Sequence, residues 1–301
     1  MKTIIIAGGT GFLGKILERY FTVKGYVIKI LTRNPTEVNH ILWNAKDLGA
    51  WTKSLEGTEV LINLTGKSVD CRYTDKNKKL IYDSRIDATH MLGLAINLCK
   101  NPPKIWMNSS TATIYKGSLD KEMTEAHGDI GDDFSMNIAK AWEAAFNSII
   151  TPKTRKIILR TSIVFGKSGG AFIPLKKLTQ FGLGGKQGSR QQKVSWIHEL
   201  DFCRAIAFLI NNTTLKGAFN LCVPKPTDNF TLMKTFRNVL NIPFGVSHPI
   251  FMLQLGAKLI GTETELVLKS RNVVPERLLK QNFKFNFENI KTALQDLTSA
   301  R

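Results

Sequence analysis

The stretch Thr3-Ile-Ile-Ile-Ala-Gly-Gly-Thr-Gly-Phe-Leu-Gly14 decides the fold of this chain. A β-branched run leads into Gly9-x-Gly11-x-x-Gly14, and the helical pattern Lys15-Ile-Leu-Glu-Arg-Tyr-Phe21 follows. Glycines allow a tight turn and a close approach of the backbone, and a helix N-terminus favours negative charge. A strand, a glycine turn and a helix in this order therefore predict a site for a dinucleotide pyrophosphate. The alternative is an ordinary turn between a strand and a helix.

The end of the next predicted strand, 26–31, indicates which dinucleotide is bound. A site for NAD usually offers an acid to the ribose hydroxyls about 20 residues past the glycines. This chain has Leu31-Thr-Arg-Asn-Pro35 there, without an acid. The guanidinium of Arg33 suits a ribose 2′-phosphate, so we expect NADP in preference to NAD. The alternative interpretation of Arg33 is a solvated loop residue.

Strands and helices alternate through the first half of the chain. This order predicts an α/β fold, a doubly wound parallel sheet of the Rossmann type, with a smaller, mainly helical C-terminal domain. We expect residues 1–165 to form the NADP-binding domain, with 194–223 returning to it, and residues 166–193 and 224–301 to form the substrate-binding domain. The further predicted strands are 59–64, 104–108, 156–164 and 217–222, and the long helices are 77–100 and 134–150.

Composition limits the other functions. The net charge is +18, but the basic residues are spread along the chain and no nucleic-acid-binding motif is present, so no specific nucleic acid is expected. No apolar run approaches the ~20 residues of a membrane span, and no secretory signal opens the chain. The four cysteines form no C-x-x-C pair, and the histidines lack metal-ligand spacing. These features predict a cytoplasmic protein without a membrane or metal partner, and they leave a homodimer open.

Several motifs together resemble the extended short-chain dehydrogenase/reductase superfamily, in its NAD-dependent epimerase/dehydratase-like group. A closer resemblance is to a poorly characterised epimerase-like branch with a short C-terminal domain, generally described as binding NADP. The motifs shared with the superfamily are Gly8–Gly14, Ile62-Asn-Leu-Thr-Gly66, Asn108–Tyr115, Leu159-Arg-Thr161 and Trp196–Asp201, and those of the closer branch include Tyr73-Thr-Asp75, Ala141-Trp-Glu143 and Val274-Pro-Glu-Arg-Leu278. The cofactor-binding positions that the resemblance implies are Gly8, Thr10, Gly11, Phe12, Leu13, Gly14, Arg33, Leu64, Thr65, Gly66 and Lys140.

The resemblance also implies which residues would carry hydride-transfer chemistry. In the superfamily a Ser or Thr orients the substrate, a Tyr is the acid/base, and a Lys lowers the pKa of that Tyr. Thr111 and Lys140 occupy two of these positions, but Met136 stands at the tyrosine position, and a thioether cannot transfer the proton. Tyr115 is the alternative phenol, and its other interpretation is a wall of the pocket. Glu143 is expected to pair with Lys140 as an i, i+3 neighbour.

The shared motif Trp196–Asp201 contains two further polar residues, His198 and Asp201. His198 is expected to be structural or at the edge of a pocket rather than a catalytic base. Asp201 is expected to cap the helix that follows it.

The basic, glycine-rich segment 176–193 is expected to border the substrate pocket. Lys186 and Arg190 are its candidate ligands for a small molecule that is anionic or nucleotide-linked. The leading hypothesis is an NADP-dependent oxidoreductase or epimerase with an atypical acid/base. The alternative is a non-catalytic NADP(H)-binding sensor or scaffold, which Met136 supports. A basic nucleic-acid or membrane-surface protein is supported by net charge alone.

Overall fold

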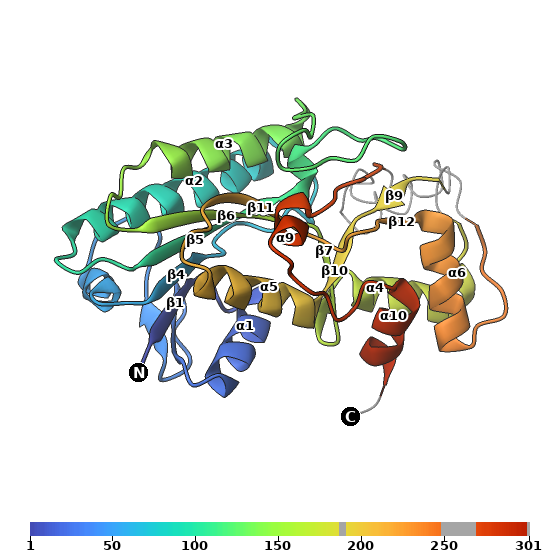
Figure 1. Cartoon of the computed structure of the whole chain (residues 1–301), viewed down its shortest axis with the longest axis horizontal. Helices are drawn as coiled ribbons and strands as arrows, with labels where there is room; N and C mark the ends of the chain where they lie inside the picture. Colours follow the sequence, from blue (N-terminus) through green and yellow to red (C-terminus); the bar gives the residue numbers. More distant parts are fainter. Residues whose placement is uncertain (187–190, 248–268, 300–301) are drawn as a thin grey trace.

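The computed structural model of the 301-residue chain describes residues 1–186, 191–247 and 269–299. Its centre is a seven-stranded sheet in the order β11-β6-β5-β4-β1-β2-β3, and every neighbouring pair is parallel (Figure 1). The order runs outward from β1 in both directions, so the predicted doubly wound parallel sheet is confirmed. The strands are β1 (Thr3–Ala7), β2 (Val27–Thr32), β3 (His40–Leu42), β4 (Val60–Asn63), β5 (Ile105–Thr111), β6 (Arg155–Thr161) and β11 (Gly217–Leu221).

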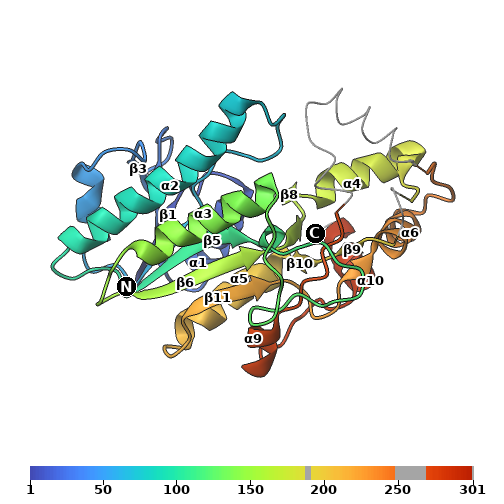
Figure 2. The ribbon, with the colours of Figure 1, turned by 90° about the horizontal axis from the view of Figure 1, so that it is seen from above.

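Helices cover both faces of this sheet because successive apolar side chains of each strand point to opposite faces. Ile4 and Ile6 of β1 belong to the core that packs against α1 (Phe12–Val23) and α5 (Glu199–Asn211). Ile5, between them in sequence, belongs to the opposite core. That core packs against α2 (Asp75–Leu98) and α3 (Phe134–Ser148), and Figure 2 shows both helices crossing the same face.

The predicted strand 156–164 is in fact two strands. β6 ends at Thr161, and β7 (Ile163–Gly166) joins a smaller sheet with β10 (Trp196–His198) and β8 (Gly169–Gly170). Between them, Ser162 donates its backbone N–H to Leu221 O at 3.1 Å, which holds the chain at the end of β11 as it leaves the large sheet. The sequence did not reveal this break, because apolar residues stand on both sides of Ser162 and both strands are partly buried.

The C-terminal region is mainly helical, as expected. α4 (Phe172–Leu178), α6 (Asn229–Leu240) and α10 (Ile290–Thr298) surround an apolar cluster that includes Phe165, Trp196 and Phe236. In Figure 1 this region lies beyond the carboxyl ends of the large sheet. The domain boundaries given above stay predictions. The remaining elements are β9 (Lys193–Val194), paired with β12 (Thr227–Asp228), η1 (Ala50–Leu55), η2 (Ala112–Ile114), η3 (Thr179–Leu183) and α9 (Glu276–Lys280).

Candidate functional site

The glycine turn between β1 and α1 has three positions with different physical demands. Gly8 has a φ of +71°, and a Cβ on it would lie 2.9 Å from the Cα of Thr65. A Cβ on Gly14 would lie 2.0 Å from the carbonyl oxygen of Gly9, so the helix can approach the turn only without a side chain there. Gly11 is different, because a Cβ on it would meet no atom within 4 Å. The turn therefore faces open space at Gly11, at the N-terminus of α1.

That open space belongs to a cleft of about 940 Å³ at the carboxyl ends of the strands. Seven of the predicted cofactor-binding residues line it: Gly8, Thr10, Gly11, Arg33, Leu64, Thr65 and Gly66. Helix α2 supplies one wall through Leu80, Asp83, Ser84 and Asp87. The N-terminus of a helix and an open, glycine-lined turn make this cleft suitable for a diphosphate.

Two buried polar atoms of the cleft also suit a polar ligand. The Thr65 hydroxyl and the Trp43 indole N–H have no hydrogen-bond partner in the part of the chain that the structure describes. Both residues line the cleft. Buried polar atoms nearly always have partners, so a bound molecule would complete these two. The cleft therefore fits the dinucleotide that the glycine motif predicts.

The loops after β2 and β3 place two cations at one end of the cleft. Arg33 follows β2, and Lys46 follows β3; both are exposed and line the cleft. The Asn44 side-chain oxygen accepts the backbone N–H of Lys46 at 2.9 Å, which fixes the loop. None of the residues from these two loops that line the cleft is acidic. Sequence reasoning found Arg33 and missed Lys46, because Lys46 is outside the motif and is brought near only by β3.

A buried network supports the loop that carries Thr65. The side-chain oxygen of Asn63 accepts the backbone N–H of Thr65 at 3.0 Å, and its NH₂ donates to Asn108 at 2.7 Å. Thr89 of α2 lies within 3.3 Å of Asn63 and accepts the indole N–H of Trp142 at 3.0 Å. The network joins β4, β5, α2 and α3. A satisfied buried network of this kind rigidifies the wall of the cleft.

Phe12, Leu13 and Gly14 do not line the cleft. The first two pack against the apolar core beside α1. A Cβ on Gly166 would lie 2.4 Å from Phe12 Cζ, and one on Gly169 would lie 2.5 Å from Phe12 Cδ2. These two glycines of the β7–β8 hairpin therefore leave room for the aromatic ring. The packing of Phe12 is therefore the structural reason for Gly166 and Gly169.

Helix α3 carries the positions where the superfamily has its acid/base. Met136 is buried, with 5% of its surface exposed. Lys140 forms an ion pair with Asp132. Asp133 caps the helix through the Met136 N–H at 2.9 Å and forms an ion pair with Lys269. Lys269 is a contact that sequence reasoning missed, because it lies 136 residues away along the chain.

Tyr115 is part of a buried polar chain rather than an open pocket. Its side chain is 1% exposed, its OH donates to Asn220 at 3.0 Å, and it accepts from Arg160 at 2.6 Å. Burial raises the pKa of the phenol. Arg160 also holds Glu143 through two hydrogen bonds of 2.8 and 2.7 Å, and Ser110 donates to the same carboxylate at 2.6 Å. The expected Lys140–Glu143 pair is therefore wrong: Glu143 points toward the sheet, where Arg160 neutralises it.

Thr111 ends β5, where its hydroxyl accepts the backbone N–H of Thr113 at 3.1 Å and lies 2.9 Å from the Thr113 hydroxyl. In the register of the sheet, Thr111 lies opposite Thr161 of β6. The cleft lined by the glycine turn includes neither Thr111 nor Tyr115 nor Lys140. Thus seven of the eleven expected cofactor residues line one cleft, and the expected catalytic residues lie in separate contacts.

His198 caps α5, in place of the expected Asp201. Its Nδ1 accepts the Leu200 N–H at 3.1 Å, and its ring stacks on Phe287 with centroids 3.9 Å apart. Burial lowers the pKa of His198 to about 4, so the ring is neutral at physiological pH. Asp201 lies in the first turn of α5, where it binds Arg204 and accepts the Phe287 N–H at 2.8 Å. The cap prediction failed because a histidine nitrogen can also accept this bond.

Of the two expected substrate ligands, the structure describes Lys186 alone. Lys186 is exposed at the end of the segment that follows η3. Arg190 lies outside the described residues.

Within the described ranges, no three His, Cys, Asp or Glu side chains are grouped so as to hold a metal ion. None of the helices in those ranges is long and apolar enough to cross a membrane.

A Rossmann-type sheet with a glycine turn opening onto a cleft defines a dinucleotide-binding protein. Residues 4–222 match the NAD dependent epimerase/dehydratase family, and residues 248–297 match a domain of unknown function, DUF1731. The chain therefore belongs to the NAD-dependent epimerase/dehydratase family. It is 32% identical over 305 residues to the epimerase family protein SH2119 of Staphylococcus haemolyticus, covering 100% of each chain.

Solved structures agree with this assignment. The human epimerase family protein SDR39U1 (isoform2) with NADPH superposes with a TM-score of 0.88 at 26% identity, covering 98% of each chain. A nucleoside-diphosphate sugar epimerase from Corynebacterium glutamicum has a TM-score of 0.80 at 23% identity, over 97% of this chain and 57% of that one. The second likeness concerns the fold alone. Family and neighbours together support a nucleotide cofactor of the NAD(P) type.

Proposed function

We propose that the protein binds NADP(H) in the glycine-turn cleft and acts as an oxidoreductase or epimerase on a small anionic molecule. The observation that carries the proposal is the shared cleft: the open face of Gly11, the unsatisfied Thr65 hydroxyl and two cations line one cavity. NADP(H), when bound, supplies hydride-transfer chemistry. The human relative's structure was solved with NADPH, which agrees with this proposal.

Different residues of the cleft would bind different parts of the cofactor. The N-terminus of α1 would receive the diphosphate beside Gly11, because its backbone N–H groups and dipole favour negative charge. Arg33 and Lys46 would hold the 2′-phosphate, one as a bidentate fork and the other as a point charge. No acid from the adjoining loops lines the cleft to repel that phosphate. The preference for NADP over NAD rests on these charges.

Arg33→Ala should weaken NADPH binding by about 1.5–3 kcal/mol, because hydrogen bonds to charged groups contribute that much. NADH binding should stay nearly unchanged, since NADH lacks the phosphate. Lys46→Ala should show the same selectivity with a smaller loss. Calorimetric titration of each variant with both cofactors measures this. Equal losses of affinity for NADPH and NADH would show that these cations do not bind the 2′-phosphate.

We also propose that Lys140 binds the nicotinamide-side ribose, a role that the superfamily resemblance implies for this position, in addition to its ion pair with Asp132. Two variants separate the roles: Lys140→Ala removes the amine, and Asp132→Asn removes only its exposed partner. We expect Lys140→Ala to weaken NADPH binding roughly fivefold or more, and Asp132→Asn to leave it unchanged, because a direct hydrogen bond is worth about 1 kcal/mol. Fluorescence titration with NADPH measures both. Identical behaviour of the two variants would reduce Lys140 to a surface ion pair.

A non-catalytic NADP(H)-binding protein is the second candidate. Met136 cannot transfer a proton, and the Tyr115 phenol is buried and hydrogen-bonded on both sides. The discriminating experiment follows the absorbance of NADPH with a broad panel of anionic carbonyl compounds. Cofactor oxidation that depends on one substrate supports the enzyme. Tight NADPH binding without turnover of any compound supports the sensor or scaffold.

The anionic substrate class is proposed from the basic residues of the segment 176–193, among which Lys177 is exposed. Lys186 stays a prediction as a further ligand, and so do the cytoplasmic location and the homodimer.

A further inference from the structure

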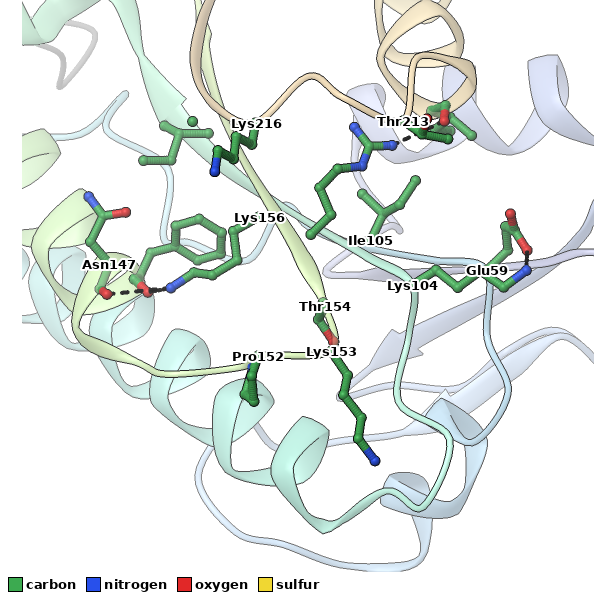
Figure 3. Close-up of a pocket in the computed structure, with 15 residues that line it drawn as sticks. Glu59, Lys104, Ile105, Asn147, Pro152, Lys153, Thr154, Lys156, Thr213 and Lys216 are labelled. Carbon is green, nitrogen blue, oxygen red and sulfur yellow. Dashed lines mark hydrogen bonds and ion pairs between the residues drawn. The ribbon is translucent and has the colours of Figure 1, made fainter.

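A second cavity, of about 960 Å³, opens at the edge of the large sheet opposite the glycine turn (Figure 3). Its lining includes the residues at or just before the start of four strands: Glu59, Lys104, Arg155 and Gly217. The strands are parallel, so their amino ends meet at this edge, while the glycine turn follows the carboxyl end of β1. We call it the amino-edge cavity. It shares no lining residue with the cofactor cleft.

The amino-edge cavity is strongly basic. Among the lining residues that the structure describes, Glu59 is the one carboxylate, and the cations are Lys104, Lys153, Arg155, Lys156 and Lys216. Glu59 already binds Lys104 at 3.0 Å and Lys2 at 3.5 Å, so it neutralises little of the remaining charge. Figure 3 shows Lys156 and Lys216 on one side of the opening and the Lys104–Glu59 pair on the other.

Two of these cations cover the C-terminal ends of helices. The Lys156 amine donates to Ile149 O at 2.7 Å just beyond α3, and it also donates to Phe146 O. Arg155 donates to Leu209 O and Ile210 O at the end of α5, at 3.0 and 3.1 Å. Free helix carbonyls would repel an anion. Because Arg155 and Lys156 cover them, the floor of the cavity stays compatible with a negative ligand.

Donors remain available after these contacts. Arg155 makes a third bond, to Leu215 O at 2.6 Å, so three of its five N–H groups are used and two are left. Lys153 and Lys216 are exposed and have no ion pair in the described part of the chain. Fixed guanidinium donors flanked by free ammonium groups are the features that bind phosphate oxygens.

We propose that the amino-edge cavity is a second anion site, which binds a small molecule carrying two or more phosphate groups. Cations from three separate segments (Lys104, 153–156 and Lys216) surround a space too large for a single phosphate. Several charged groups on one ligand would engage them together. This site is separate from the cofactor cleft, and the proposal holds whether or not the protein is an enzyme.

The test is calorimetric titration with inorganic tripolyphosphate at about 0.15 M salt, where exposed charges more than about 8 Å apart are largely screened. The protein is first saturated with NADPH, which would occupy the cofactor cleft. The titration is repeated on Gly11→Val without NADPH, so the result does not depend on whether NADPH binds. We expect one saturable site in both cases. No saturable binding in either case would overturn the proposal.

Matched charge reversals locate the site. Lys153→Glu with Lys216→Glu should weaken tripolyphosphate binding by roughly tenfold or more, through lost and reversed charges. The control is the double variant Lys53→Glu with Lys234→Glu, which changes two exposed lysines elsewhere and lowers the net charge equally. It should change tripolyphosphate binding less than about twofold, because distant charges are screened. Equal weakening in both variants would mean general attraction and would refute the site. A short single-stranded DNA that binds there more tightly than tripolyphosphate would also contradict a small-molecule ligand.

Discussion

Replacing Gly11 by valine should abolish NADPH binding while the protein stays folded. The Gly11 backbone is extended, with φ −81° and ψ −180°, which valine adopts freely, and a Cβ there meets no atom within 4 Å. The branched side chain would instead fill the space proposed for the diphosphate. We expect the affinity to fall roughly 100-fold or more, which corresponds to about 2.7 kcal/mol. Fluorescence titration with NADPH, together with a thermal melt, measures both properties.

Two other glycines make the test specific. Gly49 is exposed and extended, its nearest neighbour to a Cβ is 3.7 Å away, and it does not line the cleft, so Gly49→Val should bind NADPH normally. Gly14→Val should instead damage the fold, because a Cβ there would lie 2.0 Å from the Gly9 carbonyl oxygen. Normal NADPH binding by Gly11→Val would show that the turn is only structural.

Glu143→Ala should be the most destabilising single change among the polar residues discussed. The Glu143 and Arg160 side chains are 10% and 12% exposed, and their charges lie 2.7 Å apart. Removing one partner leaves the other charge buried and uncompensated, which costs about 3–5 kcal/mol. It also removes the acceptor for Ser110. Urea denaturation measures the change in the free energy of unfolding.

The double variant Glu143→Ala with Arg160→Met is the control for this mechanism. It should recover part of the lost stability, because an apolar pair no longer holds an unpaired charge. Asp129→Ala, which breaks an exposed pair with Lys121, should leave the urea midpoint nearly unchanged. A Glu143→Ala protein as stable as the wild type would contradict the buried-pair account.

Local patterns predicted most of the fold. The apolar residues of β1 and of residues 105–107 alternate between the two cores, so these strands were predictable from the sequence. The long helices α2 and α3 lie within about two residues of their expected ranges. The glycine turn was also predictable, because its spacing and context carry the physical requirements of a diphosphate site. The short strand β3 was not predicted, since three residues carry too little pattern.

Long-range partners explain what the sequence did not reveal. Glu143 has Lys140 one turn away on its own helix, yet it pairs with Arg160, which arrives on β6. The i, i+3 rule concerns exposed helix faces, and Glu143 lies on the buried face of α3. Lys46 and Lys269 reach their places through loops whose paths no local pattern specifies. Tyr115 likewise finds Asn220 across 105 residues.

A crystal structure of the protein with NADPH would show whether the cofactor lies in the glycine-turn cleft. We expect the diphosphate at the N-terminus of α1 beside Gly11, with Thr65 in contact with the cofactor. We also expect the 2′-phosphate within hydrogen-bonding distance of Arg33 or Lys46. NADPH bound outside this cleft, or a 2′-phosphate directed into solvent away from both cations, would contradict the proposed cofactor site.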